Sequence, residues 1–154
     1  MKIAVGSDHR GFELKEEIRE YLSSSGHEVK DFGCFSKDSC DYPEFAMKAA
    51  EAVAGGAFEK GVLFCGTGIG MCLAANKVPK IRAAVIHDEK DARRASSHNN
   101  ANVVCIGSES AGKNEAKKMI GTWLKTPFEG GRHAMRLEMV RKIEDKYAGK
   151  RGND

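Results

Sequence analysis

The feature that most constrains the fold of this chain is a regular alternation of short apolar runs with longer amphipathic segments. The apolar runs at 2–6, 27–32, 61–65, 81–86 and 102–106 are expected to be strands, and the segments at 12–24, 41–53 and 88–97 helices. A glycine loop at 66–70 opens a further helix that continues to 76. Strands joined by right-handed helical crossovers lie parallel, so the sequence predicts an α/β fold with a doubly wound, five-stranded parallel sheet.

The length of the chain fits one domain. Its 154 residues, 41% of them apolar, can bury a core without disulfides or a metal. After the fifth strand we expect a helix at 111–125 and then a charged helical extension at 132–147. Residues 1–147 are therefore predicted to form a single domain, and residues 148–154 a disordered tail.

Charge and cysteine usage exclude several classes of protein. The 25 basic and 22 acidic residues are mixed along the chain and give a net charge of +3, so no surface for nucleic acid is expected. No apolar run approaches the ~18 residues that a membrane span requires. The five cysteines are odd in number and form no C-x-x-C pair, which is typical of reduced thiols. We expect a cytoplasmic protein with no nucleic acid or membrane partner.

The loop CGTGIG at 65–70 is the richest candidate for a site. Ligands bind at the carboxyl ends of parallel strands, and this loop follows the third predicted strand. Its alternate glycines let successive N–H groups converge on an anion at the start of a helix. It is not a dinucleotide fingerprint, because Met71 stands where a glycine is required. The alternative is a tight turn that needs glycine only for its backbone.

Cys65 ends its predicted strand and faces this loop, a setting that favours the thiolate and hence a role as a base. A buried core cysteine is the alternative for Cys65. It is the favoured interpretation of Cys34, Cys40, Cys72 and Cys105, because cysteine is among the most buried residue types.

Other polar residues suggest roles in proton transfer and anion binding. Asp8, His9 and His98 offer groups that can exchange protons, although a loop histidine is more often a surface residue. Arg132 and Arg136 are four residues apart on a predicted helix and could clamp a phosphate; a solvated charged face is the alternative. No spacing of histidines and cysteines indicates a metal site, so none is expected.

A second possible anion loop follows the fifth predicted strand. GSESAGK at 107–113 matches a P-loop as far as Lys113, but Asn114 replaces the Ser or Thr that binds magnesium. Glu109 also puts a carboxylate where phosphates would lie. A nucleotide-binding module built on Gly107 to Lys113 is therefore the rival function from another class.

Six short motifs occur in order along residues 1–147. They are SDHRG at 7–11, DYP at 41–43, CGTGIG at 65–70, ANK at 75–77, HN at 98–99 and GGRH at 130–133. Together they resemble the ribose-5-phosphate isomerase B family, which also includes galactose-6-phosphate isomerase subunits. The resemblance implies a Rossmann-like three-layer α/β/α domain and an aldose–ketose isomerase that needs no metal or other cofactor. It also implies a homodimer, or a tetramer, whose active site combines two subunits.

The resemblance also implies roles for single residues. Cys65 would be the base that moves a proton between C2 and C1 of an open-chain sugar phosphate through a cis-enediolate. Thr67 would assist at the reacting oxygens, and Asp8 and His98 would handle hydroxyl protons during ring opening. The enediolate and hydroxyl oxygens would be bound by the backbone of Gly66, Gly68, Ile69 and Gly70 and by Asn99. The phosphate would be bound by His9, Arg132 and Arg136.

One departure concerns the substrate. Many members of the family carry an arginine in the loop after the fifth strand, where this chain has Glu109. A carboxylate there should weaken phosphate binding unless another residue compensates. D-ribose 5-phosphate is the expected substrate, and a six-carbon sugar phosphate of the galactose 6-phosphate or allose 6-phosphate type is the alternative. A protein that binds a sugar phosphate without catalysis is a third.

Overall fold

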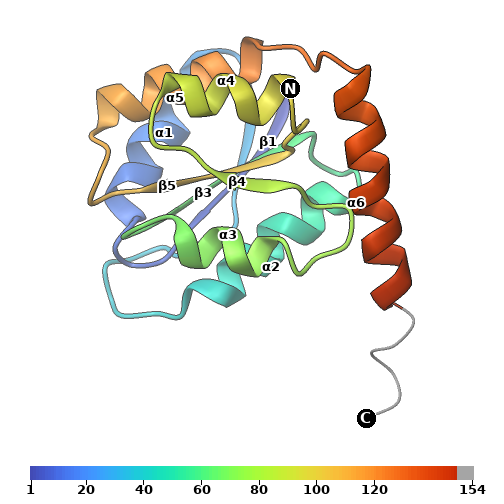
Figure 1. The fold of residues 1–154 in the computed structure, drawn as a ribbon. Coiled ribbons are helices and arrows are strands. Elements are labelled where there is room, and N and C mark those ends of the chain that lie inside the picture. The colour runs from blue at the N-terminus through green and yellow to red at the C-terminus, as the bar shows by residue number, and fades with distance from the viewer. Residues whose placement is uncertain (149–154) are drawn as a thin grey trace.

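The computed structural model describes residues 1–148, which form an α/β domain around one five-stranded, all-parallel sheet (Figure 1). The elements are β1 (Lys2–Ser7), α1 (Phe12–Ser24), β2 (Glu28–Asp31), α2 (Tyr42–Ala54), β3 (Lys60–Cys65), α3 (Ile69–Ala75), β4 (Ala83–Val85), α4 (Glu89–Ser97), β5 (Val103–Gly107), α5 (Lys113–Lys125) and α6 (Arg132–Ala148). The predicted alternation and the parallel sheet are confirmed. The predicted tail begins at 148, the last residue of α6; residues 149–154 lie outside the described residues.

Several bounds differ from the prediction by one or two residues, and two of these differences have a local cause. The fourth strand was expected at 81–86 but spans only Ala83–Val85, because the N–H of Arg82 donates to the side chain of Asn102, 2.8 Å away, instead of to a strand. The helix expected from residue 111 begins at Lys113. The N–H of Ala111 is instead used in a turn that closes on the carbonyl of Gly107.

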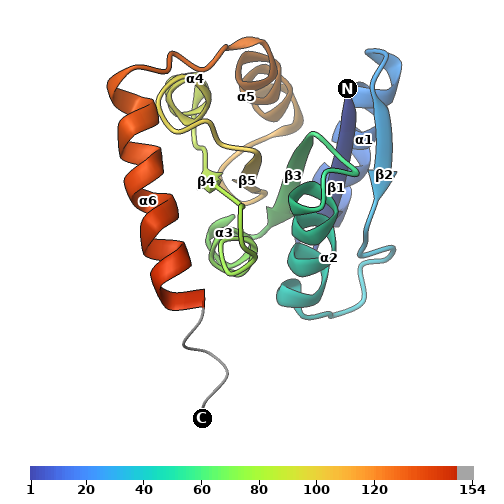
Figure 2. The same cartoon turned by 90° about the vertical axis from the view of Figure 1, so that its right-hand side faces the viewer.

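The helices cover both faces of the sheet, which confirms the three-layer prediction (Figures 1 and 2). Helices α1, α4 and α5 pack on one face around Ile18, Ile120 and Trp123. Helices α2 and α3 pack on the other, and Cys65 belongs to this smaller core. Trp123 is fully buried, and its indole N–H donates to the carbonyl of Ala101 over 3.2 Å. Both cores consist largely of the apolar positions that the strand and helix patterns identify.

The strand order β2-β1-β3-β5-β4 fixes where a ligand should bind. From β1 the chain crosses to β2 on one side, and β3 continues the sheet on the other side of β1. The crevice between the carboxyl ends of β1 and β3 is therefore the switch point at which ligands bind in such sheets. Asp8 follows β1 directly and Cys65 ends β3, so both border this crevice.

Helix α6 lies toward the opposite edge, on the β4 side of the sheet and next to the amino end of β4 (Figure 2). In Figure 1 the strands run from the α6 side of the molecule toward the turn between β3 and α3. Only His133 of α6 is buried, whereas Met135 and Met139 are 71% and 65% exposed. No helix among the described residues is long and apolar enough to span a membrane.

Candidate active site

Cys65 is held at the carboxyl edge by the loop that follows it. Its Sγ accepts the N–H of Gly68 at 3.0 Å, and the residue is only 5% exposed. Gly68 has φ of +79°, a conformation that bends the chain back over the sulfur and that side chains disfavour. As predicted, Cys65 lies against a turn that is lined by glycines.

The first turn of α3 supplies further donors beside the sulfur. The N–H of Ile69 donates to Oγ1 of Thr67 over 3.2 Å. The N–H groups of Gly70 and Met71 lack an intrahelical acceptor, because they lie in the first turn. A Cβ on Gly70 would come within 2.9 Å of the Tyr42 ring, so this glycine is needed for the ring to lie against the loop. Tyr42 is a wall of the site that we did not predict, although the DYP motif contains it.

Asp8 and His9 lie across the crevice, and their neighbours fix their orientation. Oδ1 of Asp8 accepts the N–H groups of Arg10 and Gly11, both at 2.9 Å. Nδ1 of His9 lies 3.2 Å from the N–H of Cys40 and 3.3 Å from its carbonyl oxygen, so the ring is held through Nδ1, and Nε2 is the nitrogen not used in these contacts. Asp8 can therefore accept a proton or a hydroxyl hydrogen bond, and His9 offers a ring nitrogen to a ligand.

Glu109 lies at the same edge and is paired with a residue that we did not assign to the site. Its Oε1 accepts Nη1 of Arg10 at 2.9 Å, and both side chains are more than half exposed. A Cβ on Gly66 would come within 2.7 Å of this carboxylate, which puts the pair directly beside the glycine loop. Arg10 thus offsets the charge reversal at Glu109. No pattern along the chain connects the two, since they are 99 residues apart.

The loop at 107–113 does not offer a P-loop cradle. The N–H groups of Ser108 and Glu109 donate to the carbonyls of Cys65 and Gly66, and those of Ser110 and Ala111 to that of Gly107. A P-loop needs such groups free to bind phosphates. Lys113 points to Glu17 at 3.5 Å, away from the crevice. These contacts argue against the nucleotide-binding alternative.

The other predicted site residues lie at the amino edge. His98 ends α4 and its ring stacks on that of His133, with centroids 4.3 Å apart and planes at 7°. Asn99 follows His98, and Arg132 and Arg136 are exposed on the first turns of α6. Burial and the neighbouring charges of His98, Arg132 and Arg136 lower the pKa of His133.

One chain therefore does not bring its predicted site residues together. The N–H of Gly61, near the start of β3, donates to the carbonyl of Asn102, three residues after Asn99. Cys65 ends the same strand, and at ~3.3 Å per residue the strand from Lys60 to Cys65 spans about 16 Å. Cys65, Asp8 and His9 form one group of residues, and His98, Asn99, Arg132 and Arg136 a second. We call them the carboxyl-edge group and the amino-edge group.

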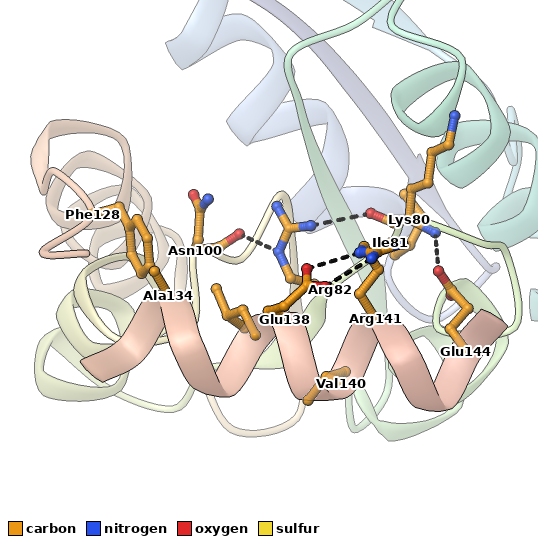
Figure 3. A pocket seen from close by; sticks show the side chains of 11 residues that line it. Lys80, Ile81, Arg82, Asn100, Phe128, Ala134, Glu138, Val140, Arg141 and Glu144 are labelled. Atoms are coloured by element: carbon orange, nitrogen blue, oxygen red, sulfur yellow. Dashed lines mark hydrogen bonds and ion pairs between the residues drawn. The ribbon is translucent and has the colours of Figure 1, made fainter. Parts of the chain in front are cut away.

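A pocket of about 320 Å³ separates α6 from the amino ends of the strands (Figure 3). Arg82 crosses it and donates from Nε to the carbonyl of Asn100 at 2.8 Å, and the N–H of Lys80 donates to Glu144 on α6 at 3.0 Å. Figure 3 shows both bonds, of which the one from Lys80 joins the segment before β4 to the helix. This bond ties α6 to the amino end of β4.

The remaining thiols differ in their protonation. A hydrogen bond from Cys105 lowers the pKa of Cys72 to about 7, and burial raises the pKa of Cys105. Burial raises the pKa of Cys40 to about 11, so the thiol beside His9 stays neutral near pH 7. A neutral Cys40 leaves the surroundings of His9 suited to an anion.

Among residues 1–148, one cluster has the donor atoms and spacing for a metal ion. Single ligand atoms of His98, Glu129 and His133 lie within 4.8 Å of one another. The prediction that no metal is bound rested on spacing along the chain, and spacing does not reveal this cluster because the turn before α6 brings it together. Glu129 had no signal of its own in the sequence.

Comparisons with known proteins agree on one family. The model of the Ribose/Galactose Isomerase family matches residues 3–140. Ribose-5-phosphate isomerase B of Escherichia coli is 45% identical over 145 residues, which is 94% of this chain and 97% of the relative. D-erythrulose-4-phosphate isomerase of Pectobacterium atrosepticum is 42% identical over 141 residues, or 91% and 93% of the two chains.

Solved structures give the same result for the fold. Ribose-5-phosphate isomerase B of Clostridium thermocellum superposes with a TM-score of 0.94 at 48% identity, covering 96% of this chain and 99% of that one. The enzyme of Mycoplasma genitalium, solved with bound ribulose-5-phosphate, has a TM-score of 0.90 at 40% identity and covers 94% and 96%.

Proposed function

This chain belongs to the ribose/galactose isomerase family, and from that premise we propose that it interconverts D-ribose 5-phosphate and D-ribulose 5-phosphate. It is an aldose–ketose isomerase of sugar phosphates. The observation that carries the proposal is the buried Cys65 sulfur, 3.0 Å from the N–H of Gly68 at the switch point of the sheet. A cis-enediolate is the intermediate that such a site can stabilise, because one base serves both C1 and C2 on the same face.

Cys65 is the proposed base. As a thiolate it takes the proton from C2 of the open-chain aldose and returns it to C1, while the hydroxyl proton on O2 passes to O1, which yields the ketose. The N–H of Gly68 donates to the sulfur from a fixed turn and so holds it in place for proton transfer. In the reverse reaction Cys65 takes the proton from C1 of the ketose and returns it to C2.

The loop after Cys65 is the proposed site for the charge that develops on the oxygens. Donors fixed before the reaction stabilise an oxyanion without any cost of reorganisation. The backbone of Gly66, Gly68, Ile69 and Gly70 supplies them, and Oγ1 of Thr67, which accepts the N–H of Ile69, keeps a hydroxyl proton to donate to a substrate oxygen.

Ring opening needs a group that protonates the ring oxygen and one that accepts the anomeric proton. His98 and Asp8 are the proposed pair, with Asn99 binding a substrate hydroxyl. Oδ1 of Asp8 already accepts two N–H groups, so Oδ2 is the oxygen left to face the substrate. Phosphate binding is assigned to Nε2 of His9 and to the guanidinium groups of Arg132 and Arg136, which bind phosphate bidentately.

Because the carboxyl-edge and amino-edge groups are about 16 Å apart in one chain, we infer that a second copy completes each site. In a twofold dimer, the carboxyl edge of one subunit would face the amino edge of its partner. The exposed apolar surface of α6, which includes Met135 and Met139, supports a buried contact there. The assembly is a homodimer, or a tetramer built from such dimers.

The length of the sugar is part of the proposal, since relatives of similar identity carry the names of isomerases for four- and five-carbon sugars. The Arg10–Glu109 pair beside Gly66 leaves little net charge where many relatives have an arginine. A six-carbon sugar phosphate is the alternative substrate.

The five unpaired cysteines support a location in the cytoplasm.

The test is to incubate the purified protein with four-, five- and six-carbon aldose phosphates and to quantify the ketose products. We expect ribose 5-phosphate to give the highest kcat/KM. A higher value for a hexose phosphate would overturn the five-carbon assignment. Tight binding of sugar phosphates without any product would instead identify a protein that binds without catalysis.

A further inference from the structure

Three side chains with metal-binding atoms meet at the amino edge, on the end of α4, the turn before α6 and the first turn of α6. Nε2 of His98 is 3.9 Å from Oε2 of Glu129, and Nε2 of His133 is 3.7 Å from the same oxygen. The imidazole rings are stacked with planes at 7°, so their nitrogens face the carboxylate side by side. Two imidazoles and a carboxylate form a common donor set for Zn²⁺.

The cluster is held together by the backbone around it. The N–H of Glu129 donates to the carbonyl of Ser97 at 3.0 Å, which fixes the turn to the end of α4. Oγ of Ser96 donates to the carbonyl of Thr126 at 2.6 Å, and Gly130 turns the chain with φ of +67°. These bonds hold the backbones of the three residues near one another.

The distances suit a small transition metal ion. Ligands at ~2.0–2.1 Å in a tetrahedral site are separated by about 3.4 Å, so each imidazole nitrogen must approach the Glu129 oxygen by only a few tenths of an ångström. The two nitrogens, which lie within 4.8 Å of each other, must also move closer together. The side chains of His98 and Glu129 are 39% and 59% exposed, which leaves a route for the ion and room for a water as fourth ligand.

We propose that His98, Glu129 and His133 form a binding site for Zn²⁺ or a similar divalent transition metal ion, and that the bound ion inhibits the isomerase reversibly. The inhibition rests on the proposed function of His98 in ring opening, whereas the binding does not. An ion on Nε2 of His98 occupies the lone pair that would carry the proton, so the cyclic substrate stays closed.

The neighbouring cations set the strength of the site. Arg132 and Arg136 lie on the same first turns of α6 and repel a cation. With three protein ligands and this repulsion, we expect a dissociation constant of about 1–10 μM for Zn²⁺, well above that of structural zinc sites.

The binding test uses the full chain after treatment with EDTA, titrated with zinc chloride in a calorimeter and with cobalt chloride in a spectrophotometer. We expect one ion per chain and the visible absorption of tetrahedral Co²⁺ without a thiolate charge-transfer band. His133→Ala and Glu129→Gln should each weaken binding at least about tenfold. Circular dichroism checks that both variants are folded.

Two matched controls report on other ligands. Cys34→Ser removes a thiol on the carboxyl-edge side, and His87→Ala removes the exposed His87–Asp91 pair. Both should bind Zn²⁺ as the parent chain does. Loss of binding in Cys34→Ser with retention in His133→Ala would overturn the proposal, as would no binding below about 100 μM.

The activity test separates this proposal from the proposed function. Each variant is assayed with and without Zn²⁺ and compared with its own metal-free rate. Inhibition that EDTA reverses in the parent chain, and that is lost in Glu129→Gln, supports the proposal; inhibition that persists in Glu129→Gln overturns it. A parent chain that binds one ion at this cluster but isomerises no sugar phosphate would contradict the proposed function and leave the binding site standing.

Discussion

The two edges of the sheet hold their functional groups in different ways. At the carboxyl edge, Cys65 and Asp8 are 5% and 6% exposed, and both accept backbone N–H groups from the loops that follow them. At the amino edge, Arg132 and Arg136 project from the surface of a helix of which only His133 is buried. The carboxyl-edge side chains are held in place by contacts within the chain, whereas the arginines of the amino edge are exposed on the surface of α6.

This difference assigns the two edges different parts of the proposed reaction. The proposed base Cys65 and its oxyanion donors must be fixed to within a fraction of an ångström, which the fold itself achieves at the end of β3. Groups that recognise a phosphate, such as Arg132 and Arg136, tolerate more freedom and can come from another subunit, as can the proposed ring-opening group His98. Mutations of Cys65 and of the two arginines should therefore change different kinetic parameters.

The largest effect is expected from Cys65→Ala. Removal of the base should lower kcat about a thousandfold or more, because general base catalysis contributes roughly 10²–10⁴. Steady-state kinetics with ribose 5-phosphate and coupled detection of ribulose 5-phosphate measures it. Cys105→Ala, in the same core, is the control and should keep the parent kcat. If Cys65→Ala keeps the parent turnover, Cys65 is not the base and the proposed difference between the two edges is wrong.

A second experiment asks whether the two edges act across subunits. Cys65→Ala and His98→Asn are each expected to be nearly inactive, but unfolding and refolding them together should restore about a quarter of the parent activity. Half of the dimers would then be mixed, and each mixed dimer would have one intact site. If the mixture stays as inactive as its components, both edges of one site come from the same chain.

A smaller effect is expected from Arg136→Ala. The loss of one charge-assisted hydrogen bond to phosphate should raise KM about ten- to a hundredfold and leave kcat within a few-fold. Arg141→Ala is the matched control on the same helix, because its guanidinium already pairs with Glu138 and Asp145. A fall in kcat with KM unchanged would assign Arg136 to the chemical step.

The smallest effect is expected from Glu109→Gln. It frees Arg10 at an exposed ion pair, so stability should change by less than about 1 kcal/mol. KM for ribose 5-phosphate should fall a few-fold at low salt, because a negative charge beside the glycine loop is gone, and the change should fade as salt increases. Glu115→Gln, on α5, is the control. An unchanged KM would mean that the phosphate lies far from Glu109.

The sequence predicts this fold well because strand and helix patterns are local. Apolar runs such as 61–65 located the elements to within a few residues, and the parallel direction of the strands follows from the helical crossovers between them. The late start of β4 was missed, since it depends on the side chain of Asn102. That contact joins segments 20 residues apart.

The site could be predicted only in part, for the same reason. Cys65 and its glycine loop are contiguous, so their geometry follows from the order of residues. Glu129 and His133 reach His98 only through the turn before α6, and Arg10 reaches Glu109 only because β1 and β5 flank β3. Such contacts depend on tertiary packing, which no periodicity along the chain encodes.

The burial of Trp123 gives the protein an intrinsic optical reporter. It is the only tryptophan in the chain, and its indole N–H is bound to the carbonyl of Ala101, three residues after His98. The ammonium of Lys60 lies 4.8 Å from its ring. Its fluorescence emission therefore comes from a single dry environment behind the amino edge. A shift of that emission to longer wavelength would report unfolding of this part of the sheet without any label.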